Sequence, residues 1–310
     1  MNKLLTIVAF LGLLNTVACE AEFDPGSRVQ SFRVLGQEMD VPFAKPGETV
    51  NVTSLSYDPQ GRTVSWAWAA CVNPDSATVQ GCFDKIAEDA QQSGTSPVLA
   101  QGAEMSAFSY TVPANALDLL PESAKPSALI GIASVACPGD LSIEPGPNHL
   151  PFTCKEAGTG RAMALEEYVI GVKRIQVRAN DRNENPVIEQ VLFDGEEWPE
   201  DEMKTVKACN TDSNEYKPCA QDTKHEITAQ PTPGSVQSGT TEFGVAFTEQ
   251  VIIEYYATEG VFEYDVKIAA DPKTGWAARK AASGKDLTIW MVLHDDRGGA
   301  TWAARRVSVE

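Results

Sequence analysis

The sequence is poor in positive charge and in histidine. Its 310 residues include 25 Lys and Arg against 43 Asp and Glu, a formal charge of −18, and only 3 His. Nucleic-acid binding requires clustered Lys and Arg to neutralise phosphates, and an anionic membrane face also attracts basic segments. The acidity therefore argues against nucleic acid as a partner and against docking on a membrane by charge.

Short motifs of common enzyme classes are missing or incomplete. The sequence contains no Gly-x-Ser-x-Gly nucleophile elbow and no phosphate-binding glycine loop. His225-Glu226 begins like a zinc-protease helix, but Ala229 stands where the second His is required. The three histidines, at positions 149, 225 and 294, lie in or beside predicted loops, so a triad would need unrelated loops to converge. We therefore predict no catalytic residues.

The alternative is a hydrolase with an unrecognised site. A deep pocket in which His225 or His294 met Asp or Glu would favour the hydrolase, and a flat surface tipped with loops would favour binding. Sandwich folds more often carry binding sites on their loops.

Residues 1–18 have the pattern of a secretion signal. Lys3 gives a short positive region, residues 4–14 are apolar, and small residues lead to Cys19. The apolar run is shorter than the roughly 20 residues of a transmembrane helix. The segment Thr16-Val17-Ala18-Cys19 resembles the lipobox of bacterial lipoproteins, with Thr16 where Leu is usual.

The lipobox resemblance implies that Cys19 is lipidated with palmitate and begins the mature chain. It predicts a lipoprotein signal peptide at 1–18 and a lipidated tether at 19–28. Ordinary cleavage after Ala18, which would leave a soluble secreted protein with a free thiol, is the alternative. We expect the protein in the bacterial cell envelope, anchored in the outer membrane on its periplasmic or surface face.

Seven cysteines leave six if Cys19 carries lipid, and an even number in an exported chain suggests disulfides. Their spacing favours bonds between sequence neighbours. The predicted pairs are Cys71–Cys82, Cys137–Cys154 and Cys209–Cys219. Each would close a short loop and stabilise the fold by about 3 kcal/mol in the chain-entropy model. A zinc site is disfavoured, because no Cys-x-x-Cys occurs and no His stands at ligand spacing from a Cys.

From residue 29 onward, short apolar segments alternate with Pro, Gly, Asn and Asp. Residues 62–71 place Trp66 and Trp68 on one face at period two, which predicts a strand with both rings in the core rather than a carbohydrate platform. Residues 127–137 are apolar on both faces, which is typical of a central strand. A short helix is predicted at 83–91. The other principal strands are predicted at 29–35, 49–57, 168–178, 187–193, 224–229, 250–257, 261–268, 287–293 and 301–309.

Residues 180–185 contain no apolar side chain and precede Pro186, so they are predicted to be a linker between two runs of strands. Two such runs predict an all-β chain of two tandem antiparallel β-sandwiches, at 29–179 and 186–310.

Three segments carry a resemblance to known domains. Residues 45–66, with the turn Asp58-Pro59-Gln60-Gly61, look like the B–C region of bacterial Ig-like domains of the PKD and cadherin-like kind. Residues 183–195 are similar to the first strand of such a domain, and residues 290–302 to the last two strands of uncharacterised bacterial lipoproteins with Ig-like domains. The resemblance implies two Ig-like sandwiches and carries over no catalytic residues.

The densest charge run lies at residues 194–203. Its candidate binding-surface residues are Glu196, Glu197, Trp198, Glu200 and Asp201. An aromatic flanked by acids suggests a platform for a sugar or a protein. The alternative is a solvated loop whose Trp198 covers the rim of the sandwich.

Stacking of tandem Ig-like domains end to end suggests a second acidic group. The B–C and F–G loops of the second domain would then face the first domain, next to the linker. The candidate calcium ligands at this joint are Asn180, Asp181, Glu184, Asp295 and Asp296. Calcium takes six to eight oxygen ligands, although Arg182 and Arg297 would compete for the same acids. The same stacking would place loop 194–203 at the far end of the molecule, away from the membrane.

These observations predict a lipid-anchored, non-catalytic binding or structural module of the cell envelope, with calcium as the one cofactor considered. The expected partners are the membrane, through the anchor, and an envelope protein or polysaccharide. The alternatives are a calcium-dependent adhesin or carbohydrate-binding protein, and the envelope hydrolase described above.

Overall fold

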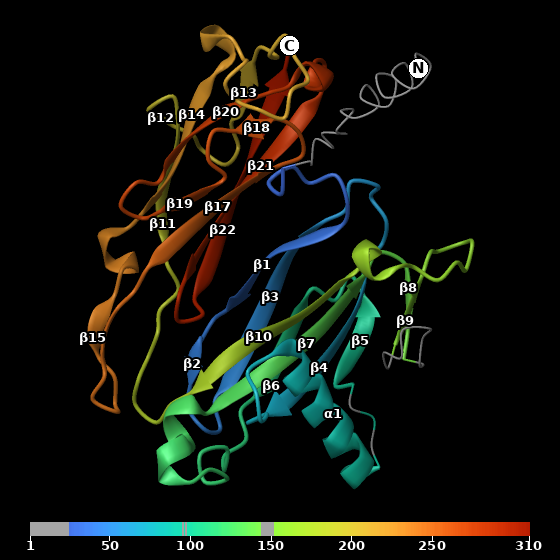
Figure 1. Cartoon of the computed structure of the whole chain (residues 1–310), viewed down its shortest axis with the longest axis vertical. Coiled ribbons are helices and arrows are strands. Elements are labelled where there is room, and N and C mark those ends of the chain that lie inside the picture. Colours follow the sequence, from blue (N-terminus) through green and yellow to red (C-terminus); the bar gives the residue numbers. More distant parts are fainter. Residues whose placement is uncertain (1–24, 95, 97, 144–151) are drawn as a thin grey trace, which may run out of the picture.

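The structure, a computed structural model, describes residues 25–94, 96, 98–143 and 152–310 (Figure 1). The predicted signal peptide, Cys19 and the first part of the tether lie outside the described residues. Figure 1 shows two blocks of strands, one formed by the first half of the chain and one by the second, with the α-helix α1 beside the first.

The first block consists of two facing sheets. Its strands are β1 (Arg33–Met39), β2 (Phe43–Ala44), β3 (Thr49–Tyr57), β4 (Ser65–Val72), β5 (Ala100–Ala103), β6 (Ala107–Thr111), β7 (Leu129–Cys137) and β10 (Val169–Val177). One sheet has the order β1-β3-β6 and the other β2-β10-β7-β4-β5. A separate hairpin joins β8 (Asp140–Ser142) and β9 (Thr153–Lys155), and the helices are α1 (Val79–Ser93), η1 (Glu122–Ser127) and η2 (Leu165–Glu167).

The second block repeats the plan. Its strands are β11 (Ile188–Phe193), β12 (Glu196–Glu197), β13 (Met203–Val206), β14 (His225–Pro231), β15 (Ser238–Thr240), β16 (Ala246–Thr248), β17 (Val251–Ala257), β18 (Val261–Phe262), β19 (Val266–Ile268), β20 (Lys273–Ala277), β21 (Asp286–Asp295) and β22 (Ala300–Val309). The sheets have the orders β12-β11-β14-β20-β18 and β13-β22-β21-β17-β19, and β15 and β16 form a separate hairpin. The short helices are η3 (Gln221–Thr223), η4 (Pro233–Ser235) and η5 (Lys280–Ala282).

The strand order is that of immunoglobulin-like sandwiches, in which strands A, B and E share one sheet and C, F and G the other. In the first block β1, β3 and β6 stand as A, B and E, and β4, β7 and β10 as C, F and G. In the second block β11, β14 and β20 face β17, β21 and β22 in the same way. The prediction of an all-β chain with two tandem Ig-like sandwiches is confirmed.

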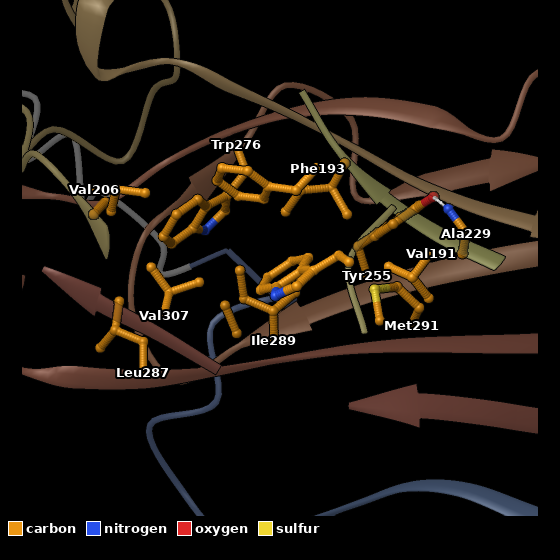
Figure 2. Close-up of a cluster of buried hydrophobic side chains, with 14 of the residues drawn as sticks. Val191, Phe193, Val206, Ala229, Tyr255, Trp276, Leu287, Ile289, Met291 and Val307 are labelled. Atoms are coloured by element: carbon orange, nitrogen blue, oxygen red, sulfur yellow. Dashed lines mark hydrogen bonds between the residues drawn. The ribbon is translucent and has the colours of Figure 1, made fainter. Parts of the chain in front are cut away.

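Each sandwich is built around tryptophan. Trp66 and Trp68 of β4 are almost fully buried and stack with centroids 5.5 Å apart, which confirms their predicted core role. The second core contains Trp276, Tyr255 and Ile289 (Figure 2). Strand β17 buries every second residue, as its alternation of side chains requires.

Two local predictions needed correction. The helix is longer than 83–91, because Thr78 accepts a hydrogen bond from the Gly81 amide and Gly94, at φ 67°, ends the helix. Residues 261–268 are not one strand. The chain crosses between sheets there, since β18 pairs with β20 and β19 pairs with β17.

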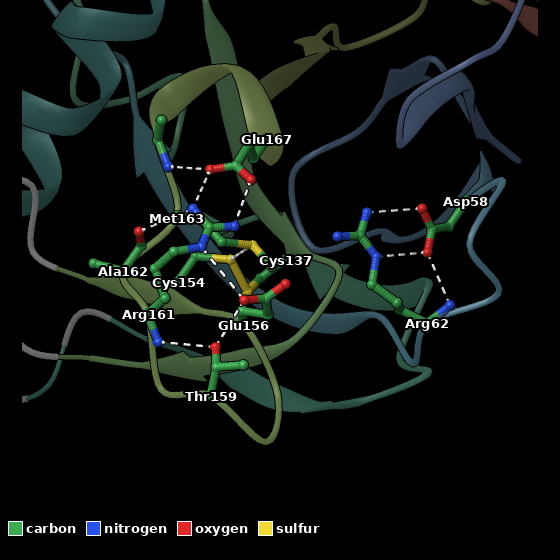
Figure 3. Close-up of polar contacts among 11 residues, drawn as sticks. Asp58, Arg62, Cys137, Cys154, Glu156, Thr159, Arg161, Ala162, Met163 and Glu167 are labelled. Atoms are coloured by element: carbon green, nitrogen blue, oxygen red, sulfur yellow. Dashed lines mark hydrogen bonds and ion pairs between the residues drawn. A yellow bond between two sulfur atoms is a disulfide. The ribbon is translucent and has the colours of Figure 1, made fainter.

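The three predicted disulfides are present, joining Cys71 to Cys82, Cys137 to Cys154 and Cys209 to Cys219. The first ties α1 to the central strands of its sheet, and the second lies under the β8–β9 hairpin (Figure 3). All cysteines of the described residues are thereby paired.

The two sandwiches meet over a face as well as at the linker, which corrects the expected end-to-end stack. Trp290 and Val292, on the outer face of β21, form a buried cluster with Val29 and Leu35 of the first half. Tyr57 packs on Trp290 with ring centroids 4.8 Å apart. Apolar contact along this face gives the two domains a fixed side-by-side arrangement.

The end of the predicted tether contacts the second domain. The Val29 amide donates to the Ala257 carbonyl at 2.9 Å, and the Ala257 amide donates to the Ser27 carbonyl at 2.9 Å. Across the sheet, Ala257 of β17 lies opposite Ile289 of β21, and Ile289 lies opposite Arg305 of β22. The Arg305 Nε atom donates a hydrogen bond to the Trp198 carbonyl. Loop 194–203 therefore lies at the tether end of the second domain, and its predicted position far from the tether is wrong.

Candidate functional site

The predicted aromatic platform at residue 198 does not exist as a surface. Trp198 is fully buried, meets Phe193 edge to face with centroids 4.9 Å apart, and donates from Nε1 to the Glu202 carbonyl at 3.1 Å. Burying the indole in the core gains more free energy than leaving it exposed among the acidic side chains. The acidic neighbours Glu196, Glu197, Glu200 and Asp201 are exposed.

The predicted calcium ligands do not converge. Asp295 accepts hydrogen bonds from the amides of Arg297 and Gly299 and from Asn183 Nδ2, so its oxygens hold the β21–β22 turn to the linker. Asp181 accepts from the Glu242 amide, and the Glu242 carboxylate in turn accepts from the amides of residues 179–181. Among residues 25–94, 96, 98–143 and 152–310, no group of three or more His, Cys, Asp or Glu is arranged to hold a metal ion.

Two histidines do meet carboxylates in pockets. His225 Nδ1 lies 2.8 Å from Asp194 Oδ2 in an open polar groove of about 370 Å³, which Tyr216 and Lys273 also line. Asp194 has a positive φ of 53° and also accepts from the Glu226 amide, so it fixes the β11–β12 turn. The Nε2 atom of His225 is buried and has no hydrogen-bond partner within the part of the chain that the structure describes. It therefore does not reach a ligand in the groove.

Arg297, at the tip of the β21–β22 hairpin, contacts both domains at the joint between them. Its guanidinium carbon lies 4.5 Å from the ring centroid of Phe43 and 3.8 Å from that of Phe247, in the β15–β16 hairpin. Its Nη1 pairs with Glu249 Oε1 at 3.0 Å, where the Glu249 side chain is 0% exposed. Burial raises the pKa of Glu249, and the adjacent Arg297 opposes that shift. The β15–β16 hairpin thus acts as a strap across the linker.

A cleft opens beside this joint. It has a volume of about 400 Å³ and is bounded by β1 and β10 of the first domain and by β17 and the β21–β22 hairpin of the second. Ligand sites are common at domain interfaces, where polar groups from both sides converge. Its polar side chains are Gln37, Lys173, Glu254, His294 and Asp295, and its apolar ones are Val34, Leu35, Val169 and Val292. Val172 also borders the cleft, but its side chain packs on the other face of β10, against Cys71 and Cys82.

Lys173 is the unusual residue of this cleft. It lies on β10 in the row Gly171, Lys173, Ile175 and Val177, of which the last two are fully buried in the core. Burial lowers the pKa of Lys173, and the charges of Asp295 and Glu38 oppose that shift. A shifted pKa in a cleft marks a candidate site. We take the interdomain cleft as the candidate functional site.

No sequence motif marks this cleft. His294 and Asp295 were considered only for a hydrolase site and a calcium site, and a lone Lys on a strand face is ordinary. The one usable hint was the break in an otherwise apolar row, because a charged residue two positions before Ile175 on a core-facing strand requires a polar environment.

No protein-family model and no curated protein matches the sequence. Among solved structures, a nucleoside hydrolase-related hypothetical protein from Saccharophagus degradans matches 44% of this chain at 15% identity and a TM-score of 0.23, and the match covers 28% of that protein's chain. The N-terminal Ig1-2 module of the Drosophila receptor protein tyrosine phosphatase DLAR covers 90% of this chain and 99% of its own, at 10% identity and a TM-score of 0.24.

The D0-D1 domain of Intimin covers 89% of this chain and 98% of its own, at 8% identity and a TM-score of 0.20. All of these superpositions are loose. The fold class therefore rests on the strand order described above.

Within the described ranges, no helix is long and apolar enough to cross a membrane.

Proposed function

We propose that the chain is a lipid-anchored, non-catalytic binding module of the bacterial cell envelope. The observation that carries the proposal is the pairing of cysteines. Three disulfides use six of the seven cysteines, and only Cys19 of the lipobox-like segment is left over. Disulfides form and persist in exported proteins, and a left-over cysteine at the end of a signal-like segment suits lipidation.

The Ig-like plan supports a binding or structural role, because sandwiches present loops and interdomain surfaces on a rigid scaffold. The geometry of the histidines supports a role without catalysis. The Asp194 carboxylate that contacts His225 also holds the β11–β12 turn through the Glu226 amide, and Thr274, which also lines that groove, donates to the Tyr264 carbonyl. We further propose the outer membrane as its location and an envelope protein or polysaccharide as its partner.

The anchor is tested by mass spectrometry of the mature N-terminus after expression in a Gram-negative bacterium. The expected result is a chain that begins at a lipidated residue 19 and sediments with the outer membrane. Cys19→Ala should release the chain from the membrane fraction, whereas the matched variant Thr16→Leu, which restores the usual lipobox residue, should be processed as the wild type or faster. An unmodified thiol at residue 19 in the wild type would overturn the proposal.

A further inference from the structure

The interdomain cleft has a hollow because one residue lacks a side chain. On the inner face of β10, Gly171 lies between Val169 and Lys173. A Cβ atom added to Gly171 would meet only Ser134 Oγ at 3.6 Å and Gln37 Oε1 at 3.8 Å, which are ordinary contacts. The backbone at this position has no positive φ that would require glycine. The glycine therefore leaves open space between β10 and β1.

The hollow is lined by hydrogen-bonding groups with unused capacity. Gln37 Nε2 donates to Ser54 Oγ at 3.0 Å and to Ser134 Oγ at 3.2 Å, which fixes the amide and leaves Oε1 as an acceptor on the Gly171 side. The Lys173 ammonium has no hydrogen-bond partner among the residues that the structure describes, although it has three N–H groups to donate.

The opposite wall comes from the second domain. His294 Nε2 lies 3.9 Å from Glu254 Oε2, beyond hydrogen-bond distance, and Glu254 Oε2 accepts from the Tyr256 hydroxyl at 2.9 Å. Both residues line the cleft. Donors and acceptors thus face the space from both domains.

The charges of the cleft do not favour an ion. The Lys173 ammonium is close to the carboxylates of Asp295 and Glu38, whose charge is opposite to its own, and Glu254 also lines the cleft. Charges of both signs are therefore present, and the cleft presents no field of one sign. Asp295 already accepts three hydrogen bonds. The rest of the lining is aliphatic, mainly valine. An uncharged ligand with many hydroxyl groups and an apolar C–H face matches both parts of this lining.

We propose that the interdomain cleft binds a neutral carbohydrate the size of a mono- or disaccharide, with its hydroxyls on Gln37, Lys173 and Glu254 and its C–H face on the valines. This inference rests on the proposed function, because it names the ligand class of the binding module. The cleft volume of about 400 Å³ lies within the range of small-ligand pockets. A site shared by two domains requires that the domains keep a fixed arrangement. The contacts of Arg297 with Phe43 and Phe247, here called the Arg297 clamp, provide it.

The test is ligand-detected NMR and calorimetry on the purified full-length protein in detergent. The probes are glucose, galactose, mannose, N-acetylglucosamine and maltose, with glucuronate and glucosamine as charged analogues. At least one neutral sugar should bind with a Kd of about 1 mM or lower. Gly171→Val, which fills the hollow with a good strand former, and Lys173→Met should each weaken that binding about tenfold or more, a change of about 1.4 kcal/mol.

The matched controls are Gly234→Ala, at a glycine with open space around it, and Lys155→Met, at a lysine outside the cleft. Both should bind as the wild type. Thermal melting of every variant separates loss of binding from loss of fold. Binding unchanged in a folded Gly171→Val protein, or no binding of any neutral sugar at about 10 mM, would overturn the inference.

The two proposals fail separately. Mass spectrometry of residue 19 tests the anchor without any sugar. Hydrolysis of a bound sugar would overturn the non-catalytic role while leaving the cleft as the site. Tighter binding of glucuronate or glucosamine than of every neutral sugar would overturn the neutral ligand class.

Discussion

The Arg297 guanidinium carbon lies 4.5 Å from the ring centroid of Phe43, and this contact joins the F–G tip of the second domain to the first domain. The same carbon lies 3.8 Å from the ring centroid of Phe247, and Arg297 Nη1 pairs with the fully buried carboxylate of Glu249. A planar cation in contact with two rings, with a buried acid as its partner, is a directional contact. It fixes the angle at which the two sandwiches meet.

Arg297→Met should lower the free energy of unfolding by about 3–5 kcal/mol, because it leaves Glu249 as a buried charge without its partner. Arg297→Lys should restore only part of this loss, since an ammonium does not stack as a planar group. Urea unfolding measures both changes. Arg306→Met, which removes an exposed pair with Asp286, is the control and should change stability by less than about 0.5 kcal/mol. A loss below about 1 kcal/mol for Arg297→Met would contradict the clamp.

Stability should fall in acid partly through Glu167. Arg161 hydrogen bonds to this carboxylate and, with the Ala164 amide, lowers its pKa to about 2 (Figure 3). A pKa lowered on folding gives stability that is present above the unfolded value of 4.5 and is lost as pH falls from there to about 2. Because the pair is exposed, the effect is small.

Glu167→Gln should therefore be less stable than the wild type at neutral pH and equal to it near about pH 2. Urea unfolding across this range and NMR titration of the carboxylate provide the measurement. Glu122→Gln, at an exposed glutamate paired with Lys125, controls for the loss of one surface charge. A stability difference that persists unchanged in acid would disprove the assignment.

Trp198→Ala should destabilise the second domain by about 3–5 kcal/mol, as expected for removal of a buried indole. Glu196→Gln, two residues earlier and exposed, should change stability by less than about 0.5 kcal/mol. Thermal melting compares the two variants. A well-folded Trp198→Ala protein with wild-type stability would mean that the ring lies on the surface after all.

Gly131→Ala should destabilise the first domain by about 1–3 kcal/mol through overpacking. An added Cβ would lie 2.5 Å from Cys71 Sγ and 2.8 Å from Cys82 Sγ, so the disulfide or the strand must shift. Gly171→Ala, on the neighbouring strand, has ordinary contacts and should be neutral or stabilising. Equal melting temperatures for the two variants would show that the disulfide has room to move.

Local sequence patterns predicted most of the fold. The alternation around Trp66 and Trp68 fixed a core strand, and the run 127–137, apolar on both faces, marked the central strand β7. The spacing of the six cysteines gave all three disulfides. Each of these signals is local, because side chains on a strand alternate whatever else the chain does. Strand β20 was missed, because Gly275 and Lys273 weaken its apolar alternation.

The candidate site could not be predicted from local patterns in this way. Trp198 has acidic neighbours in sequence, yet its ring packs on Phe193, and proximity to charge did not predict its burial. The predicted calcium ligands share one region of the joint, but their oxygens bind backbone amides instead of a common centre. The position of loop 194–203 was predicted from end-to-end stacking of the domains. In the structure the domains instead pack side by side through the apolar face around Trp290.

The sequence by itself determined the class of fold, the pairing of cysteines and the core position of Trp66 and Trp68, because alternation and spacing act over short stretches of chain. Only the tertiary structure decided how the two domains meet. That arrangement depends on contacts between residues far apart in sequence, such as Arg297 with Phe43 and Trp290 with Tyr57. The cleft at Lys173 exists for the same physical reason, since its two walls belong to different domains.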